Sequence, residues 1–421
     1  MFGRAGRLGP PRNRLKDYKM FPVSNKNALG LLKWATFFSY FSLLSSVLML
    51  LYKSKGISIG DFFMLDGIFR IVGFALGIPA GYLSDIFSRK KVLLFGMLAW
   101  TFGYAALFFA YGFWQLMIPE ILMGIGVVLY HYTLGAYLYD LLKRDGREKE
   151  FLKENSHINA FAILGAVIAS IISGYVYAEI GNWATLITAA VQLVGTILVL
   201  LLPELNEFRR KISKKSTPWK DVKSVVKMSV KHPELKWFML FPAIITTFAV
   251  FVYWILQPTM ETIGVSVALF GIFIGIHRLA QVVFSKYAER IFKTVGLKNT
   301  LYICIATMAA SVAAPICALL IGTGNMWIVY ILCAVAATFS ASFKLCELVF
   351  DMLIHDRVKS TERGTVQSLS RMYVMLIGAG AMILMKPLLD GIGMEWTIVV
   401  ALAMLAVILY PLRKILAIKE I

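Results

Sequence analysis

The sequence has 421 residues, of which 59% are hydrophobic and only 16% are charged. A soluble domain cannot bury so much apolar surface, so the composition excludes an ordinary soluble protein and indicates an integral membrane protein. The formal net charge of +19 is typical of nucleic-acid-binding proteins. Lys and Arg, however, fall mainly in every second loop between apolar stretches, so we expect no nucleic-acid partner. No small-residue cleavage site follows the first apolar run, so we predict no cleaved signal peptide.

Apolar stretches of about twenty residues, the length that crosses roughly 30 Å of hydrocarbon as a helix, recur along the chain. The sequence predicts an all-α polytopic membrane protein with twelve such helices, at 31–52, 60–83, 92–111, 113–139, 156–178, 183–203, 237–257, 266–286, 299–321, 326–353, 367–388 and 394–416. An even number of spans places both termini on one side. The alternating basic loops predict that this side is the cytoplasm.

One long hydrophilic segment divides these helices into six and six. We predict a basic cytoplasmic tail, an N-terminal bundle, a cytoplasmic linker, a C-terminal bundle and a second tail, at 1–30, 31–204, 205–236, 237–416 and 417–421. The linker is interpreted either as an amphipathic helix on an anionic inner leaflet or as a plain charged connection. Two six-helix halves indicate an internal duplication. The loop GYLSDIFSRKK has a counterpart, SKYAERIFKTVGLK, at the equivalent place in the second half.

The loop between the second and third helices carries seven residues in a recognisable order: Gly81, Leu83, Ser84, Asp85, Arg89, Lys90 and Lys91. They resemble the G-x-L-S/A-D-x-x-G-R-R/K-K signature of the major facilitator superfamily. The segments LYDLLKRDGREKEF and ERGTVQSLS are similar to a bacterial, drug-exporter-like branch of that family. Ser88 stands where the family usually has glycine, so the turn is expected to fold differently there.

The resemblance implies a cytoplasmic gate, for which we select Gly81, Asp85, Arg89, Lys90 and Asp140. An acid such as Asp85 favours the positive N-terminus of a neighbouring helix. The resemblance places the start of the eleventh helix, within 360–365, opposite it. Asp140 is a second predicted partner for Arg89. The alternative is that the bases only set the topology and Asp85 is solvated.

Ionisable residues inside apolar spans are costly and therefore mark functional candidates. Arg70 lies four residues after Asp66, so the two are expected to pair, which leaves a structural role and substrate binding both open. Lys344, Glu347 and Asp351 share one face of the tenth helix. That face is interpreted either as part of a cavity or as a local ion pair that serves packing.

Further candidates for substrate binding or ion coupling are Glu120, His131, Tyr253 and Arg278. Glu120 and His131 share a face of the fourth helix, and a carboxyl and an imidazole together suit proton coupling. Drug/proton antiporters of the resembled family usually carry an arginine where this chain has Glu120. Antiport by their scheme is therefore not predicted, and a packing role for His131 remains an alternative.

These features predict a secondary active transporter of a small organic solute that works by alternating access, coupled to protons or another ion gradient. The resembled branch favours export, whereas Arg70, Arg278 and Lys344 favour import of an anionic solute. No phosphate-binding loop and no paired catalytic residues are found, so an enzyme or a transporter-like sensor is disfavoured. We expect no cofactor or metal, a monomer and a plasma-membrane location. Four cysteines within predicted spans are expected to be buried and unpaired: Cys304, Cys317, Cys333 and Cys346.

Overall fold

The structure is a computed structural model that describes residues 25–205, 233–358 and 363–417, and these ranges contain helices and no strands. The helices before the linker are α1 (Asn25–Tyr40), α2 (Leu48–Ser54), α3 (Ile59–Ile86), α4 (Arg89–Phe109), α5 (Gly112–Arg144), α6 (Phe151–Ile180) and α7 (Trp183–Leu200). Those after it are α9 (Pro233–Thr262), α10 (Val267–Ile321), α11 (Met326–Ser340), α12 (Phe343–Arg357), α13 (Arg363–Met404) and α14 (Leu409–Leu416). The predicted amphipathic linker helix and most of both tails lie outside the described residues.

Eight helical segments of the described chain are long and apolar enough to cross a membrane. They are Arg89–Phe109, Gly112–Arg144, Glu148–Ile180, Trp183–Leu201, Glu234–Thr262, Val267–Gly324, Met326–Ile354 and Leu369–Leu416. Two of them contain a bend at a glycine in the left-handed region, Gly296 with φ 76° in α10 and Gly393 with φ 80° in α13. Each bend lies between two predicted apolar stretches. Glycine stands at both bends because only glycine enters this region without steric cost.

The first predicted stretch, 31–52, is interrupted between α1 and α2. The main chain between α1 and α2 is not helical, and side chains of other helices form hydrogen bonds with it. The amide of Leu43 donates to the hydroxyl of Thr188 at 3.2 Å, and the hydroxyl of Tyr253 donates to the carbonyl of Ser45 at 2.7 Å. Such partners are what permits an irregular main chain inside a membrane protein. The stretch 326–353 is likewise interrupted, between α11 and α12.

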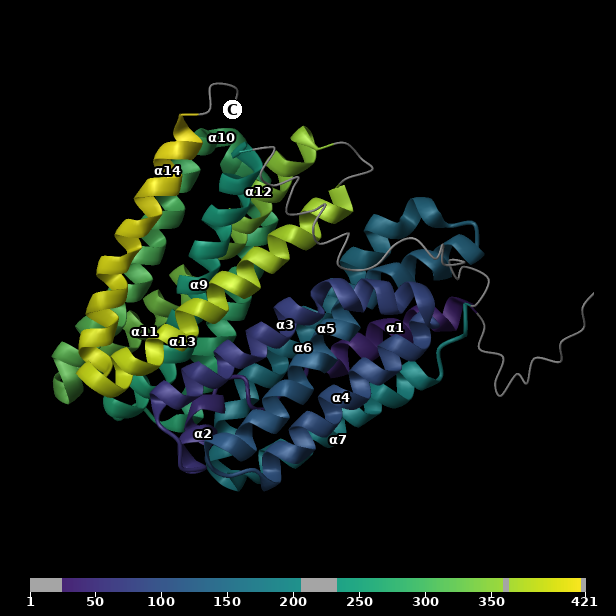
Figure 1. Ribbon diagram of the computed structural model, residues 1–421. Helices are drawn as coiled ribbons and strands as arrows, with labels where there is room; N and C mark the ends of the chain where they lie inside the picture. The colour runs from purple at the N-terminus through teal and green to yellow at the C-terminus, as the bar shows by residue number, and fades with distance from the viewer. Residues whose placement is uncertain (1–24, 206–232, 359–362, 418–421) are drawn as a thin grey trace, which may run out of the picture.

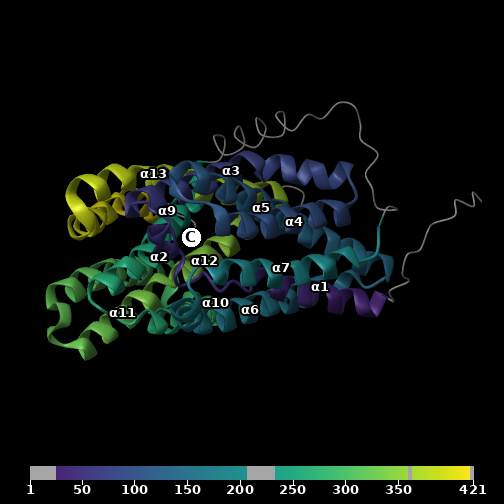
Figure 2. The same ribbon diagram turned by 90° about the horizontal axis from the view of Figure 1, so that it is seen from below.

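Helices α1 to α7 form one group and helices α9 to α14 form another, and the two groups diverge toward the upper edge of the molecule (Figure 1). Figure 2 places α3 beside α13 and α6 beside α10, and these pairs join the two groups. Small residues allow the close approach: a Cβ atom on Gly271 of α10 would lie 2.4 Å from the carbonyl oxygen of Ser170 in α6.

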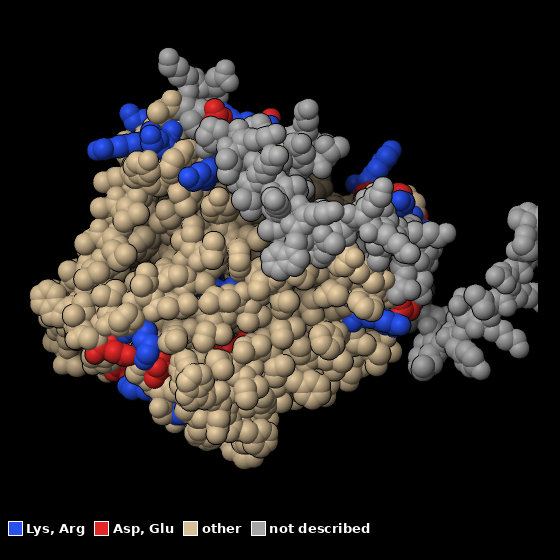
Figure 3. All heavy atoms as spheres, viewed as in Figure 1, with Lys and Arg blue, Asp and Glu red and all other residues tan. Residues whose placement is uncertain are grey.

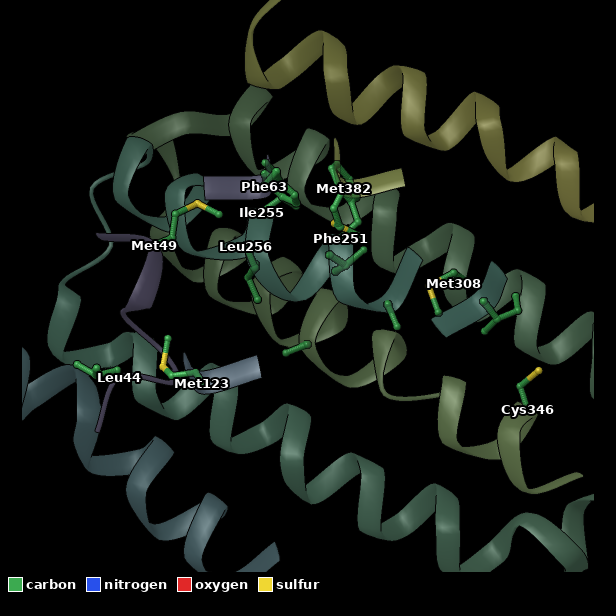
Figure 4. Packing of buried hydrophobic residues seen from close by; sticks show 14 of the residues in the cluster. Leu44, Met49, Phe63, Met123, Phe251, Ile255, Leu256, Met308, Cys346 and Met382 are labelled. Atoms are coloured by element: carbon green, nitrogen blue, oxygen red, sulfur yellow. The ribbon is translucent and has the colours of Figure 1, made fainter. Parts of the chain in front are cut away.

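Aromatic and aliphatic side chains fill the junction of the two groups (Figure 4). Phe63 of α3 and Phe251 of α9 are buried with ring centroids 5.7 Å apart, and Met382 of α13 lies beside them. Of the cysteines, Cys304, Cys333 and Cys346 are buried and free, as predicted. The prediction is wrong for Cys317, which is exposed because it lies on the outward face of α10.

Candidate functional site

At the end of the molecule that carries α2, polar side chains join the two groups of helices. We call them the α2-end cluster: Lys53, Ser58, Asp61, Glu261, Lys386 and Asp390. The ammonium of Lys386 lies 2.5 Å from Asp61 and 2.8 Å from Asp390, and the hydroxyl of Ser58 donates to Asp390 at 3.0 Å. Lys53 and Glu261 pair at 3.0 Å. Figure 3 shows acidic and basic side chains together at this lower-left edge, whereas bases dominate the upper edge. The sequence analysis did not single out this cluster.

At the opposite end, the residues of the predicted gate make contacts within the first group of helices. Arg89 pairs with Asp140, as predicted, and its guanidinium donates to the carbonyl of Ala136 at 2.8 Å. Ser88 has φ −58°, and its hydroxyl donates to Glu204. This turn therefore differs from one built on glycine, as the Ser88 departure predicted.

The rest of the predicted gate is only partly described. Gly81 lies within α3, where a Cβ atom would meet no other atom within 4 Å, and Lys90 is half-buried in the first turn of α4. Asp85 belongs to the last turn of α3, but its side chain lies outside the described residues, as do the side chains at 361–365. The contact between Asp85 and the eleventh helix stays a prediction.

Arg70 lies at the junction of the two groups and pairs with Asp66 at 2.7 Å, as predicted. Both residues are buried. The guanidinium arm of Arg70 packs against Gly378 of α13, where a Cβ atom would lie 3.2 Å from it. With its charge already matched by Asp66, Arg70 fits a structural role between α3 and α13 better than substrate binding.

Glu120 of α5 is buried and accepts a hydrogen bond from the hydroxyl of Tyr52 in α2. The short helix α2 therefore presents Tyr52 to Glu120, the one carboxyl of α5 that lies in the apolar span. A buried carboxyl with a hydroxyl partner is stable when protonated and costly when ionised. The arrangement is suited to gain and loss of a proton.

His131 lies eleven residues further along α5, about 16 Å from Glu120 along the helix axis. Its Nδ1 lies 2.7 Å from the carbonyl oxygen of Val127, and its Nε2 contacts the hydroxyl of Tyr40 in α1. Since a carbonyl oxygen only accepts, Nδ1 carries the proton and Nε2 accepts from Tyr40. The structure does not bring His131 and Glu120 into contact, so any shared role requires separate steps.

Tyr253 and Arg278 come together on the second group of helices. The guanidinium of Arg278 lies 5.5 Å from the centre of the Tyr253 ring, and His277 packs on the same ring at 5.4 Å. Within the described residues, Nε of Arg278 is buried without a hydrogen-bond partner. A buried cationic donor without an acceptor is costly, so this site favours an anionic or carbonyl-bearing ligand.

Arg371 of α13 faces the first group of helices, where its guanidinium lies 5.8 Å from the centre of the Tyr132 ring. His131, on the same helix as Tyr132, contacts the hydroxyl of Tyr40 in α1. We call this set the basic-aromatic cluster: Tyr40, His131, Tyr132, Tyr253, Arg278 and Arg371. The sequence analysis missed Arg371, although an arginine one to two turns inside a predicted span was a signal that could have found it.

Lys344 and Glu347 form the local ion pair that was one of the two interpretations, at 2.7 Å. Their side chains are 34% and 44% exposed, so the pair does not lie in a sealed core. Lys344 lies 5.3 Å from the ring of Phe343, which in turn stacks on His277. Asp351 is half-buried two turns further along α12. Through Phe343 and His277, Lys344 is linked to Tyr253 of the basic-aromatic cluster.

Three kinds of comparison identify similar proteins. A family model described as the Major Facilitator Superfamily matches residues 29–382. An uncharacterized transporter of Rickettsia bellii is 28% identical over 178 residues, which cover 39% of this chain and 42% of the relative. The arabinose-proton symporter of Escherichia coli is 24% identical over 254 residues, covering 56% and 49%. The chain thus spans less than half the length of these curated relatives.

The multidrug resistance protein MdtH of Klebsiella pneumoniae is 31% identical over 104 residues, covering 25% of this chain and 26% of that protein. Among solved structures, a variant of the nucleoside transporter NupG superposes with a TM-score of 0.79 at 12% identity, covering 93% of this chain and 100% of that one. Identity this low indicates a shared fold and carries no information on the substrate.

Proposed function

Because this chain belongs to the Major Facilitator Superfamily, a family of transporters rather than enzymes, we propose that it moves a small organic anion across the membrane by alternating access, coupled to protons. The observation that carries the proposal is the basic-aromatic cluster, in which Arg371 of one half faces Tyr132 of the other and Arg278 lies against Tyr253. A ligand held there contacts both halves, which is what alternating access requires.

The proposed topology has twelve membrane-spanning helices in two six-helix halves, 31–204 and 237–416, with both termini in the cytoplasm and the protein in the plasma membrane as a monomer. The excess of Lys and Arg in alternate loops supports it. In this topology the α2-end cluster faces outward and the Arg89–Asp140 pair faces the cytoplasm. The contacts of the α2-end cluster then close the outer side. The divergence of the two groups of helices toward the opposite edge (Figure 1) supports a conformation open toward the cytoplasm.

The substrate class follows from the chemistry of the cluster. Two guanidinium groups and three tyrosine rings suit a ligand with a carboxylate or phosphate and an apolar or aromatic body. The unbonded Nε of Arg278 supports an oxygen acceptor in the bound solute. Lys344, beside Phe343, extends the positive charge toward the cytoplasmic side of the site.

Proton coupling is assigned to Glu120, with His131 as a second titratable group next to the substrate. The hydrogen bond from Tyr52 to Glu120 supports this assignment because Tyr52 belongs to α2, the element that carries part of the outer closure. Loss of the proton leaves a buried charge, which favours the conformation that exposes Glu120 to water. The arabinose-proton symporter among the relatives is coupled to protons, as its name states.

Proteoliposomes with an imposed pH gradient test the proposal. We expect gradient-driven movement of a labelled aromatic carboxylate and little movement of the matched neutral amide. Arg371→Gln and Arg278→Gln should each weaken apparent affinity about tenfold or more, since a charge-assisted hydrogen bond contributes about 1.5–3 kcal/mol. Arg413→Gln, on the exposed last turn of α14, is the matched control. Equal transport of the acid and the amide would overturn the anion assignment.

A second candidate is export of a small amphipathic compound, favoured by the resemblance to the drug-exporter-like branch and by the similarity to the multidrug resistance protein MdtH. The direction of transport is measured in the same vesicles by reversing the pH gradient. Glu120→Gln should abolish accumulation against a gradient while substrate exchange continues. Transport that does not depend on the pH gradient would refute the role of Glu120.

A further inference from the structure

An open groove with a volume of about 480 Å³ lies at the bend of α10 at Gly296. Its lining comes from the arm of α10 before the bend and from one residue after it: Val283, Phe284, Tyr287, Arg290, Ile291, Thr294, Val295 and Ile303. Five of these are aliphatic or carry only an aromatic hydrocarbon ring, and Val283 and Tyr287 remain 54% and 41% exposed. The groove is thus an apolar channel that opens on the outer surface of the helices.

Basic side chains stand at one end of this groove. Arg290 belongs to the lining, and Lys286, Lys293 and Lys298 are exposed on the same segment. Glu289 is the one acid between Ser285 and Lys298, and it pairs with Lys293 at 2.5 Å. Arg290 and Lys286 therefore present positive charge that no carboxylate on this segment matches.

An apolar channel with a basic end has the chemistry of one particular ligand. We propose that the groove binds an anionic phospholipid of the inner leaflet, with an acyl chain against Val283 and Ile303 and the phosphate near Arg290. The proposal lies beyond the proposed transport and takes from it only the topology, which places the bend of α10 in the cytoplasmic leaflet. Figure 1 shows α10 reaching the same upper edge as the basic end of α14.

A lipid fits better than a protein partner for two reasons. The apolar part of the groove lies on a segment long and apolar enough to cross a membrane, so lipid chains surround it. The bases cluster at the bend between the two apolar arms of that segment, which in the proposed topology lies at the depth of a phosphate in the headgroup layer. Tyr287, with Lys286 5.6 Å from its ring, adds an aromatic side chain at the same level.

Native mass spectrometry of the full-length protein, after exchange into phosphatidylglycerol or phosphatidylcholine of equal chain length, tests the proposal. We expect retained phosphatidylglycerol in excess of phosphatidylcholine. Arg290→Gln should weaken phosphatidylglycerol binding about fivefold, the effect of one base near an anionic surface. Ile303→Trp fills the apolar channel and should weaken binding without changing any charge.

Lys414→Gln is the control for loss of one exposed base outside the groove, because Lys414 also lies beside an aromatic ring, 5.6 Å from that of Tyr410. Equal retention of both lipids, or unchanged binding by Arg290→Gln, overturns the proposal. Displacement of phosphatidylglycerol by inorganic phosphate alone would overturn it too, because it would indicate an anion site that holds no lipid chain. Unchanged phosphatidylglycerol binding by Ile303→Trp would have the same meaning. Because binding is measured without transport, this test is independent of the proposed function.

Discussion

Replacing Lys386 by glutamine removes the cation that joins the two halves at the α2-end cluster. In the native protein, its ammonium lies 2.5 Å from Asp61 of the first half, and the two side chains are 32% and 24% exposed. A partly exposed pair of this kind contributes about 1 kcal/mol, and the like charges of Asp61 and Asp390 left facing each other add a similar penalty. The sum of about 2 kcal/mol corresponds to an increase of about 30-fold in the ratio of outward-open to outward-closed protein.

Labelling with a membrane-impermeant maleimide measures this ratio. The reporter is Phe62→Cys in a background without the native cysteines, because Phe62 is 2% exposed and its ring lies 5.0 Å from Trp254 of the other half. We expect faster labelling in Lys386→Gln. Lys53→Gln, which removes a pair whose lysine is 53% exposed, should change the rate less than about threefold.

The exchange of charges between the two positions separates electrostatics from packing. Asp61→Lys combined with Lys386→Asp restores an opposite pair and should return labelling toward the native rate. Native labelling in Lys386→Gln would refute the assignment of the cluster as an outer closure. Fast labelling in both the single and the exchanged variant would show that charge attraction is the wrong explanation.

Three further predictions concern stability and packing. Burial lowers the pKa of Lys55 to about 8, below its value in the unfolded chain. Between these two pKa values the unfolded state binds more protons, so the melting temperature should rise from about pH 8 to pH 10. Lys55→Met should lack this rise. A Cβ atom on Gly271 would lie 2.4 Å from a main-chain oxygen of α6, so Gly271→Ala should reduce transport in vesicles, whereas Gly391→Ala, with open space around it, should not. Ser88→Gly removes the hydrogen bond to Glu204 and should cost about 1 kcal/mol in denaturant unfolding. A flat pH profile, normal transport by Gly271→Ala or unchanged stability of Ser88→Gly would contradict the respective argument.

The apolar runs were sufficient to predict a helical membrane protein, because the length and composition of each run carry the information locally. Local spacing also predicted the pairing of Asp66 with Arg70 and that of Lys344 with Glu347, since residues three or four apart meet on one helix face. The contact between Arg89 and Asp140 required the family resemblance in addition, because the two residues lie on different helices.

Contacts between the halves were not predictable in this way. Lys386 and Asp61 are 325 residues apart in the chain, and neither lies in a pattern that names the other. Arg371 was missed because the ring that it contacts, Tyr132, lies in the other half of the chain. The interruption of the first helix was missed because FSLLSSV contains no glycine or proline that would mark a break. Only hydrogen-bond partners from other helices make the irregular main chain tolerable.

The interrupted first helix contacts both titratable residues to which coupling is assigned. Tyr40, at the end of α1, contacts His131, and Tyr52, in α2, donates a hydrogen bond to Glu120. The segment between them is held by Tyr253 of the other half. Because α1 and α2 are separate helices, α2 is able to shift with the outer closure while α1 stays with the substrate site. In the proposed mechanism this separation lets the proton on Glu120 bias the outer side without direct contact with the bound anion.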